Sequence, residues 1–164
     1  MEALQLLFVC TGNICRSPAA EGIMQTLVQR QGLESLIHCD SAGTSGYHVG
    51  DRADERMRYH AKLRGYELLS LSRQFHPEDF EKFDLILVMD QRNLKSLIAL
   101  DPKLQYRSKI HNMTDFCESF SIKEVPDPYY GGDAGFEQVL DLLEDACTGL
   151  LKHLQTQKNL KPNV

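Results

Sequence analysis

The feature that most constrains the fold is an apolar segment that leads through a tight turn into a helix. Residues 4–9 are almost continuously apolar, which is typical of a strand buried on both faces of a parallel sheet. Gly12 and Asn13 follow, and both residue types readily adopt positive φ angles. Ser17 is expected to cap a helix that ends at Gly32. This order of elements predicts the first part of a right-handed βαβ unit.

The same alternation of strands and helices continues along the chain. Its apolar patterns predict strands at 37–40, 83–89 and 108–111, and helices at 53–65, 91–101 and 134–154. Loops are expected at 41–50, which contains three glycines, and at 118–132. Binding sites of such folds lie at the carboxyl ends of the strands. The loops after Val9, Asp40, Met89 and His111 should therefore share one edge of the sheet.

Length and composition exclude several classes of protein. A chain of 164 residues predicts one domain. The net charge of -5 argues against broad electrostatic binding of nucleic acid. The longest apolar runs are about five residues, whereas a membrane-spanning helix needs roughly 20. The sequence starts without a signal-peptide pattern, and its five cysteines are an odd number without the spacing of a secreted scaffold. We therefore expect a reduced, cytoplasmic protein.

The first turn also holds the strongest chemical signal, a cysteine followed after five residues by an arginine and a serine. Backbone N–H groups of such a turn and the positive end of the next helix favour an anion. Arg16 can bind two oxygens of a phosphoryl group at once, and the same positive field favours the thiolate form of Cys10. Ser17 can donate to that thiolate. The bland alternative, a buried structural thiol before an ordinary turn, does not account for this combination.

Two other phosphate-binding patterns are absent from this turn. It lacks the Gly-Lys-Ser/Thr of a Walker loop and the Gly-x-Gly-x-x-Gly of a dinucleotide site.

Residues 9–18, Val-Cys-Thr-Gly-Asn-Ile-Cys-Arg-Ser-Pro, resemble the signature loop of the low-molecular-weight protein tyrosine phosphatases. The resemblance covers most of the chain and includes residues 40–44, 73–74, 89–90 and 127–130. It implies an α/β fold, a single-domain three-layer sandwich with a four-stranded parallel sheet and helices on both faces. We expect a phosphatase domain at 1–155 and a polar C-terminal tail at 156–164.

The resemblance implies hydrolysis of phosphotyrosine, and of small aryl phosphates, in two steps. Cys10 would attack phosphorus and form a cysteinyl-phosphate, while Arg16 holds the equatorial oxygens. Asp127 would protonate the leaving phenolate and then activate water; without the resemblance, it reads as an acidic turn residue. The expected phosphate-binding residues are Thr11, Gly12, Asn13, Ile14, Cys15 and Ser17. The reaction implies no metal and no other cofactor.

The expected partners are tyrosine-phosphorylated proteins, with no nucleic acid and no membrane. We expect a monomer or weak self-association.

The resemblance also implies supporting roles for several residues, and each of these residues has a simpler local structural explanation as well. Tyr47, Tyr129 and Tyr130 would form the aromatic walls of a slot for phosphotyrosine, although the last two also suit a surface turn. Several relatives carry Trp in place of Tyr47. Asn13 would organise the loop and Ser41 would hydrogen-bond to it; otherwise they are a turn residue and a strand-end hydroxyl.

The cysteines other than Cys10 are expected to have two different roles. Cys15 would trap Cys10 as a reversible disulfide, or else is a small loop residue that packs inward. Cys39, Cys117 and Cys147 are expected to be small buried groups. Ser70 stands where many family members have His, which puts the role of that His in doubt here.

Two alternative functions use the same loop. A thioredoxin-coupled arsenate reductase needs further cysteines near the end of the third strand, and residues 80–95 contain none. A non-catalytic phosphate-binding module typically lacks the nucleophile or the acid, and here Cys10, Arg16 and Asp127 are all present. The sequence therefore favours an active phosphatase.

Overall fold

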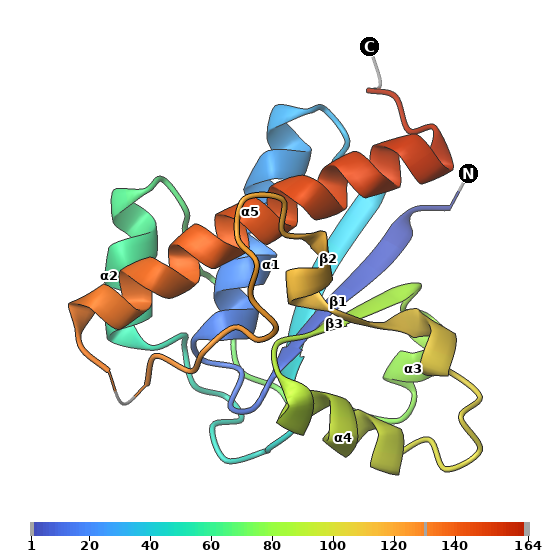
Figure 1. Cartoon of the computed structure of the whole chain (residues 1–164), viewed down its shortest axis with the longest axis horizontal. Coiled ribbons are helices and arrows are strands. Elements are labelled where there is room, and N and C mark those ends of the chain that lie inside the picture. The colour runs from blue at the N-terminus through green and yellow to red at the C-terminus, as the bar shows by residue number, and fades with distance from the viewer. Residues whose placement is uncertain (1, 130, 163–164) are drawn as a thin grey trace.

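The computed structural model, which describes residues 2–129 and 131–162, contains a four-stranded parallel sheet in the order β2-β1-β3-β4 (Figure 1). The strands are β1 (Leu4–Cys10), β2 (Ile37–Gly43), β3 (Leu85–Val88) and β4 (Ile110–Asn112). The α-helices are α1 (Arg16–Arg30), α2 (Glu55–Leu63), α3 (Asp79–Lys82), α4 (Gln91–Ala99) and α5 (Asp133–Lys158). Two short 3₁₀ helices flank β4, η1 (Arg107–Lys109) and η2 (Met113–Phe116).

The near-continuous apolar run of β1 is explained by a core on each face of the sheet. Leu6 and Phe8 pack in a cluster with α1 and α5, while Leu7 and Val9 pack with side chains from α3 and α4. All four are fully buried. Successive strand residues point to opposite faces, so a strand between two helical layers needs apolar residues at every position. The predicted three-layer sandwich is thus confirmed.

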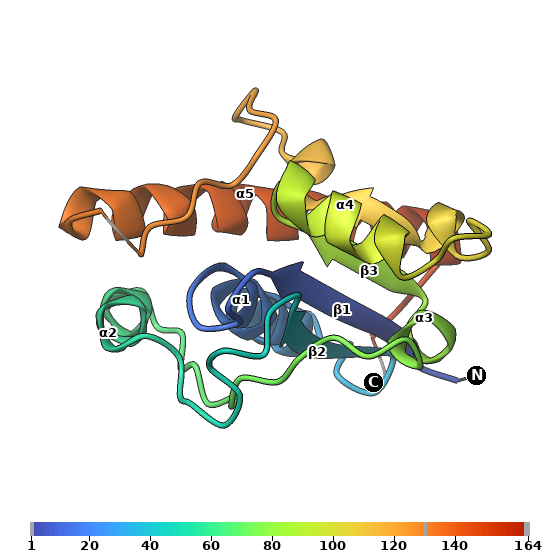
Figure 2. The same cartoon turned by 90° about the horizontal axis from the view of Figure 1, so that it is seen from below.

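The carboxyl ends of the strands bring three loops together. All strand pairs are parallel, and the arrowheads of β1 and β3 point to the same end in Figure 2. The loop after β1 contacts the loop after β2 through Thr44 N, which donates to Cys10 O (2.9 Å). Asn93 of α4 donates to Thr11 Oγ1 (3.2 Å). The segment that precedes α5 returns to the same edge, where Val125 N donates to Met89 O (2.8 Å).

Several predicted boundaries are wrong. β2 continues to Gly43 because its last residues pair with the end of β1. The helix α3 was not predicted, because a helix of four residues is too short to show a helical hydrophobic period. The helix expected to end at Leu154 continues to Lys158, so the boundary placed after residue 155 falls inside α5. The chain then turns through Asn159 (φ 50°) and buries Leu160 against the core.

Two further observations concern the burial of the cysteines and the apolar character of the helices. Cys147 is fully buried as expected, but Cys39 and Cys117 are only half-buried at the edge of the core. Within the part of the chain that the structure describes, no helix is long and apolar enough to cross a membrane.

Replacement of two glycines of α5 by alanine should change the stability of the fold in opposite directions. A Cβ at Gly149 would lie 1.8 Å from Phe116 O, a backbone atom, so Gly149→Ala should destabilise the fold by roughly 1–3 kcal/mol. A Cβ at Gly135 would meet nothing closer than 3.9 Å. Gly135→Ala should therefore stabilise the fold by about 0.5–1 kcal/mol through helix propensity. Urea unfolding measures both, and equal effects would contradict the contact with Phe116.

Candidate active site

The turn after β1 is shaped by hydrogen bonds that hold its carbonyl groups outward. Four donors from three segments of the chain make these bonds: Thr44 N to Cys10 O (2.9 Å), Ser45 N to Thr11 O (3.0 Å), Ser72 Oγ to Gly12 O (3.1 Å) and Asp54 N to Ile14 O (2.7 Å). In a trans peptide, the next N–H group points the opposite way. The N–H groups of residues 12–15 donate to no other described residue. They therefore form an inward-facing nest suited to an anion.

Cys10 lies at the start of this nest, where two polar side chains orient its thiol. Its Sγ is 3.0 Å from Ser17 Oγ. Asn13 Nδ2 donates to the same hydroxyl (2.7 Å), whose single O–H lies within reach of Cys10 Sγ and, at 3.4 Å, of Ala42 O. Asn13 reaches this position with a φ of 57°. Ser17 is thus not the helix cap that the sequence suggested, because Cys15 occupies the N-cap position of α1.

Arg16 is held by one edge of its guanidinium group. Its side chain is 3% exposed, and Nη1 donates to Asp90 Oδ2 (2.6 Å) and Val125 O (3.0 Å). Nη2 lies 3.7 Å from Asp127 Oδ2. Burial alone would lower the pKa of Arg16, but Cys10, Asp90 and Asp127 together raise it above its usual value. The guanidinium is therefore a fixed positive charge beside the nest.

Asp90 is a site residue that sequence analysis missed. Its Oδ1 accepts from Asn93 N (2.9 Å) and caps α4, so its position before a helix had a sufficient explanation. Its other oxygen makes the ion pair with Arg16, a contact across 74 positions that no local pattern signals.

Asp127 reaches the site on the returning segment before α5. Its Oδ1 accepts from Tyr129 N (3.0 Å), and its side chain is 44% exposed. The fold thus achieves the closure over the first turn that the sequence alone could not show. Compared with Asp90, Asp127 is loosely held and open to solvent.

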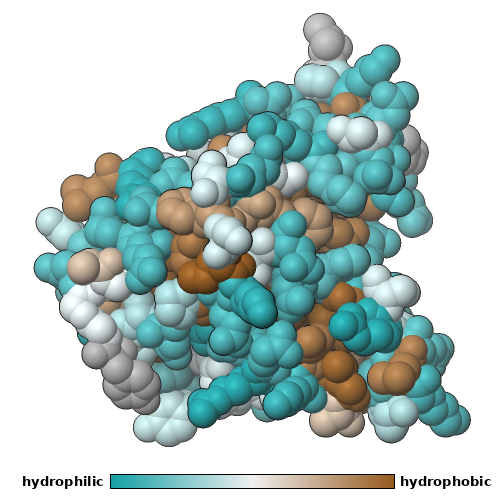
Figure 3. Space-filling model, in the orientation of Figure 1, coloured by the Kyte–Doolittle hydropathy of each residue, from teal (hydrophilic) through white to brown (hydrophobic). Residues whose placement is uncertain are grey.

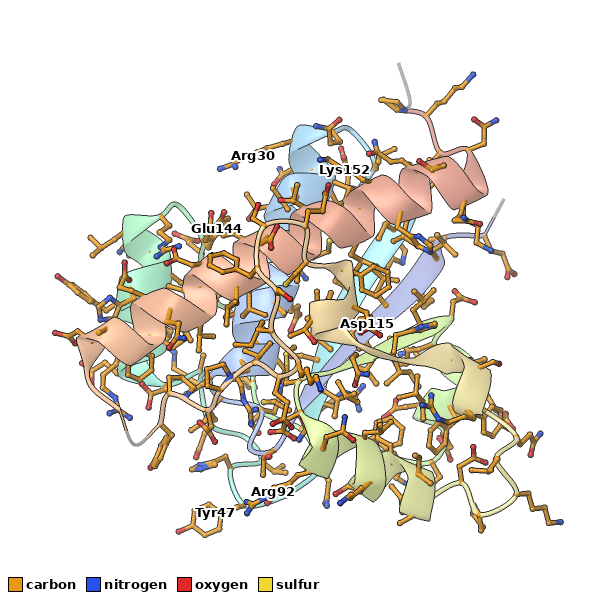
Figure 4. All side chains as sticks on the ribbon, in the orientation of Figure 1. Arg30, Tyr47, Arg92, Asp115, Glu144 and Lys152 are labelled. Carbon is orange, nitrogen blue, oxygen red and sulfur yellow. The ribbon has the colours of Figure 1, made fainter. Side chains whose placement is uncertain are left out.

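These groups line one hollow of about 170 Å³. Its lining comprises Cys10, Thr11, Gly12, Ile14, Cys15, Arg16, Ser45, Tyr47, His48, Asp127 and Tyr129. Tyr47 is 85% exposed and projects from the molecule (Figure 4). Asn13 and Ser17 do not line the hollow but lie behind it. Tyr130 falls outside the described residues.

His48 and Ser45 are lining residues that sequence analysis did not identify. His48 packs near Gly12, since a Cβ there would lie 3.1 Å from its ring. Three glycines made the segment 41–50 read simply as a loop, which gave no signal for either residue.

Ser41 does not contact Asn13, which corrects the expectation drawn from the resemblance. Its Oγ donates to Glu21 Oε1 (2.5 Å), and Ser70 also hydrogen-bonds to that carboxyl group. Asn13 Oδ1 instead accepts from Arg73 N (2.9 Å). Burial raises the pKa of Glu21, and the two serine hydroxyls act in the opposite direction. Ser41 and Ser70 thus share a buried carboxyl partner behind the site.

The second cysteine of the turn has a different environment from an exposed thiol. Burial, followed by the charge of Asp54, raises the pKa of Cys15 far above its usual value. Cys10 and Cys15 are both free thiols, so their regulatory disulfide stays a prediction. Among residues 2–129 and 131–162, no group of three or more His, Cys, Asp or Glu side chains is arranged to hold a metal ion.

Comparisons with known proteins agree on one family. Residues 5–160 match the model of the low molecular weight phosphotyrosine protein phosphatases. A Synechocystis protein named for the low molecular weight protein-tyrosine-phosphatases is 58% identical over 92% of this chain and 96% of its own. A Streptomyces coelicolor low molecular weight protein-tyrosine-phosphatase is 40% identical, over 93% and 94%. A solved protein tyrosine phosphatase from Entamoeba histolytica superposes with a TM-score of 0.92 at 50% identity, covering 95% and 99%.

The two thiols of the turn should differ in alkylation. Both thiols line the hollow, but at pH 7 iodoacetamide should modify Cys10 and leave Cys15 intact, because the raised pKa of Cys15 keeps it protonated. Raising the pH to 9 should still leave Cys15 largely unmodified in the folded protein, whereas urea should expose both thiols. Peptide mass spectrometry measures the labelling, and inorganic phosphate should protect Cys10. Equal labelling of the two thiols at pH 7 would contradict this.

Proposed function

The chain belongs to the low molecular weight phosphotyrosine protein phosphatase family, and from that premise we propose that it hydrolyses phosphotyrosine through a cysteinyl-phosphate on Cys10. The observation that carries the proposal is the meeting of Cys10, Arg16 and Asp127 in one hollow. A nucleophile, a fixed cation and a partly exposed carboxyl group are the three components that phosphoryl transfer to a thiol requires.

The phosphoryl group binds in the nest. Its equatorial oxygens accept from the N–H groups of the turn residues that line the hollow, Gly12, Ile14 and Cys15, and from the guanidinium of Arg16. Because Asp90 and Val125 fix the Nη1 edge, the remaining donors of Arg16 are already oriented when the substrate arrives. Preorganised donors of this kind stabilise the charge that spreads over the oxygens in the transition state.

The first step transfers the phosphoryl group from oxygen to sulfur. The Cys10 thiolate attacks phosphorus, the bond from phosphorus to the phenolic oxygen breaks, and that oxygen takes the proton of Asp127. Ser17 O–H donates to the thiolate before attack and keeps sulfur in place. Tyr129 N–H occupies Oδ1 of Asp127, so Oδ2 is the oxygen suited to carry the proton.

The second step returns the enzyme to its starting state. Asp127, now ionised, removes a proton from water as the water oxygen attacks phosphorus. The sulfur–phosphorus bond breaks, inorganic phosphate leaves and Cys10 is again a thiolate. Proton donor and proton acceptor are thus the same carboxyl group in the two halves of the reaction.

The shape of the hollow supports an aromatic substrate. Tyr129 and Ile14 provide apolar walls, and Tyr47 stands at the rim. A phenyl ring stacks favourably against such walls, so small aryl phosphates also fit. Tyrosine-phosphorylated proteins are the proposed partners, and the free cysteines suit the reducing cytoplasm as the proposed compartment.

Two substitutions test the chemistry with an aryl phosphate. Cys10→Ser should abolish steady turnover, and Asp127→Asn should lower the rate of phenol release by about 10²–10⁴-fold, the usual contribution of a general acid. A rapid-mixing assay follows the burst of phenol. Asp115→Asn, an exposed carboxylate from η2 that does not line the hollow, is the control and should behave as wild type (Figure 4). Wild-type turnover by Cys10→Ser would refute the mechanism.

The depth of the site predicts selectivity between phosphorylated side chains. Cys10 is only 3% exposed, so its sulfur lies at the floor of the hollow. A phosphoserine side chain is too short to reach it while its backbone rests at the rim. Two peptides that differ only at the phosphorylated residue should therefore differ in kcat/KM by at least about 100-fold, the scale on which pockets discriminate side chains. Comparable kcat/KM values would exclude a depth-selective slot.

A further inference from the structure

A row of basic side chains on α2 faces the N-terminal half of α5. Arg56 and His60 lie on α2 and Arg64 directly follows it; we call these three the α2 row. Residues four apart share one face of a helix. α2 lies beside the orange half of α5 in Figures 1 and 2, and side chains over their junction are mostly hydrophilic in Figure 3.

Two members of the row, His60 and Arg64, pair with carboxylates on α5. His60 Nδ1 is 2.8 Å from Glu137 Oε2, and its Nε2 is 3.2 Å from Asp133 Oδ1. The His60 ring is also stacked on Phe136 with a centroid distance of 5.8 Å. His60 is 7% exposed, so this contact is a buried part of the junction.

Arg64 forms the far end of the row. It pairs with Glu137 (3.1 Å), Asp141 (2.9 Å) and Glu144, and the last of these points toward α2 in Figure 4. These carboxylates all lie within α5 and touch neither the returning segment nor the hollow. Arg64 therefore docks the helices without contacting the segment that carries the acid.

Arg56 reaches beyond α5 to that segment. Its Nη2 donates to Tyr129 O (3.1 Å), and its guanidinium carbon lies 5.4 Å from the Tyr129 ring centroid. Asp54, the N-cap of α2, holds the guanidinium through two further hydrogen bonds (3.2 and 3.0 Å). Because Tyr129 N donates to Asp127 Oδ1, one residue connects Arg56 to the acid.

We propose that Arg56 and His60 are positioning residues that set the place of Asp127 over the hollow. The proposal rests on the general-acid role of Asp127 in the proposed function. Arg56 holds the backbone two residues after the acid, and His60 holds Asp133, where the segment enters α5. Asp127 itself is 44% exposed and has few direct bonds, so its placement depends on this backbone. A displacement of about 1 Å can cost 10²-fold in rate.

The test is the dependence of kcat/KM on the leaving group. When a general acid protonates the departing oxygen, poor and good leaving groups react at similar rates. In Arg56→Gln and His60→Gln, kcat/KM for phenyl phosphate should fall by about 10-fold, whereas that for 4-nitrophenyl phosphate should fall less than about 3-fold, since its leaving group needs less protonation. A series of aryl phosphates whose phenols differ in acidity gives the leaving-group slope. This slope is the change in log kcat/KM per unit of the pKa of the departing phenol.

Arg64→Gln is the matched control. It removes ion pairs of the same junction and should lower thermal stability, yet its leaving-group slope should equal that of wild type. If Arg64→Gln steepens the slope as much as the other two variants, the row is merely structural and the proposal fails. Arg56, with a side chain 45% exposed, keeps the test available should His60→Gln fail to fold.

Asp127→Asn separates this proposal from the proposed function. It should steepen the slope on its own, and adding Arg56→Gln to it should have no further effect on the slope, because both act through one group. A shallow slope for Asp127→Asn would overturn the acid role itself. A steep slope for Asp127→Asn, with shallow slopes for Arg56→Gln and His60→Gln, would overturn only the inference about α2.

Discussion

The outward anchoring of the carbonyl groups in the turn after β1 is the interaction on which the site depends. Four donors from three separate segments, at 44–45, 54 and 72, hold these peptide planes. The consequence is a set of N–H groups turned inward that have no acceptor among residues 2–129 and 131–162, an arrangement that an isolated turn would not maintain. The surrounding loops therefore do more than shield the turn. They hold it in a conformation whose backbone donors an anion satisfies.

The same site treats its two carboxylates in opposite ways. Asp90 is held by the α4 cap on one oxygen and by Arg16 on the other, which makes it a permanent counter-charge. Asp127 lies 3.7 Å from the same arginine and is far more exposed. A group that must donate a proton and later accept one benefits from solvent access, whereas a group that orients a cation benefits from burial. Position around Arg16 thus separates the proposed acid, Asp127, from Asp90, which orients the guanidinium.

Local patterns predicted the parts of this molecule that local physics determines. The apolar run at 4–9 indicated a strand covered on both faces, and the turn with Arg16 indicated an anion site, because backbone conformation and charge there depend on neighbouring residues. Partners far along the chain could not be inferred. Asp90 was expected only to precede a helix, and Ser41 was paired with Asn13 rather than with Glu21. These contacts depend on how separate segments pack, which no spacing encodes.

The α2–α5 junction shows how a fold can orient a group that it must not bind tightly. Direct hydrogen bonds to both oxygens of Asp127 would hold the carboxyl group in place but would compete with the proton transfer proposed for it. The structure instead leaves one oxygen to Tyr129 N–H and holds the carbonyl of the same residue from Arg56. Constraint is thereby applied to the backbone rather than to the reacting atoms. Asp54, the N-cap of α2, holds Arg56 through its carboxylate and Ile14 O through its N–H, so the first turn and the acid segment share one support.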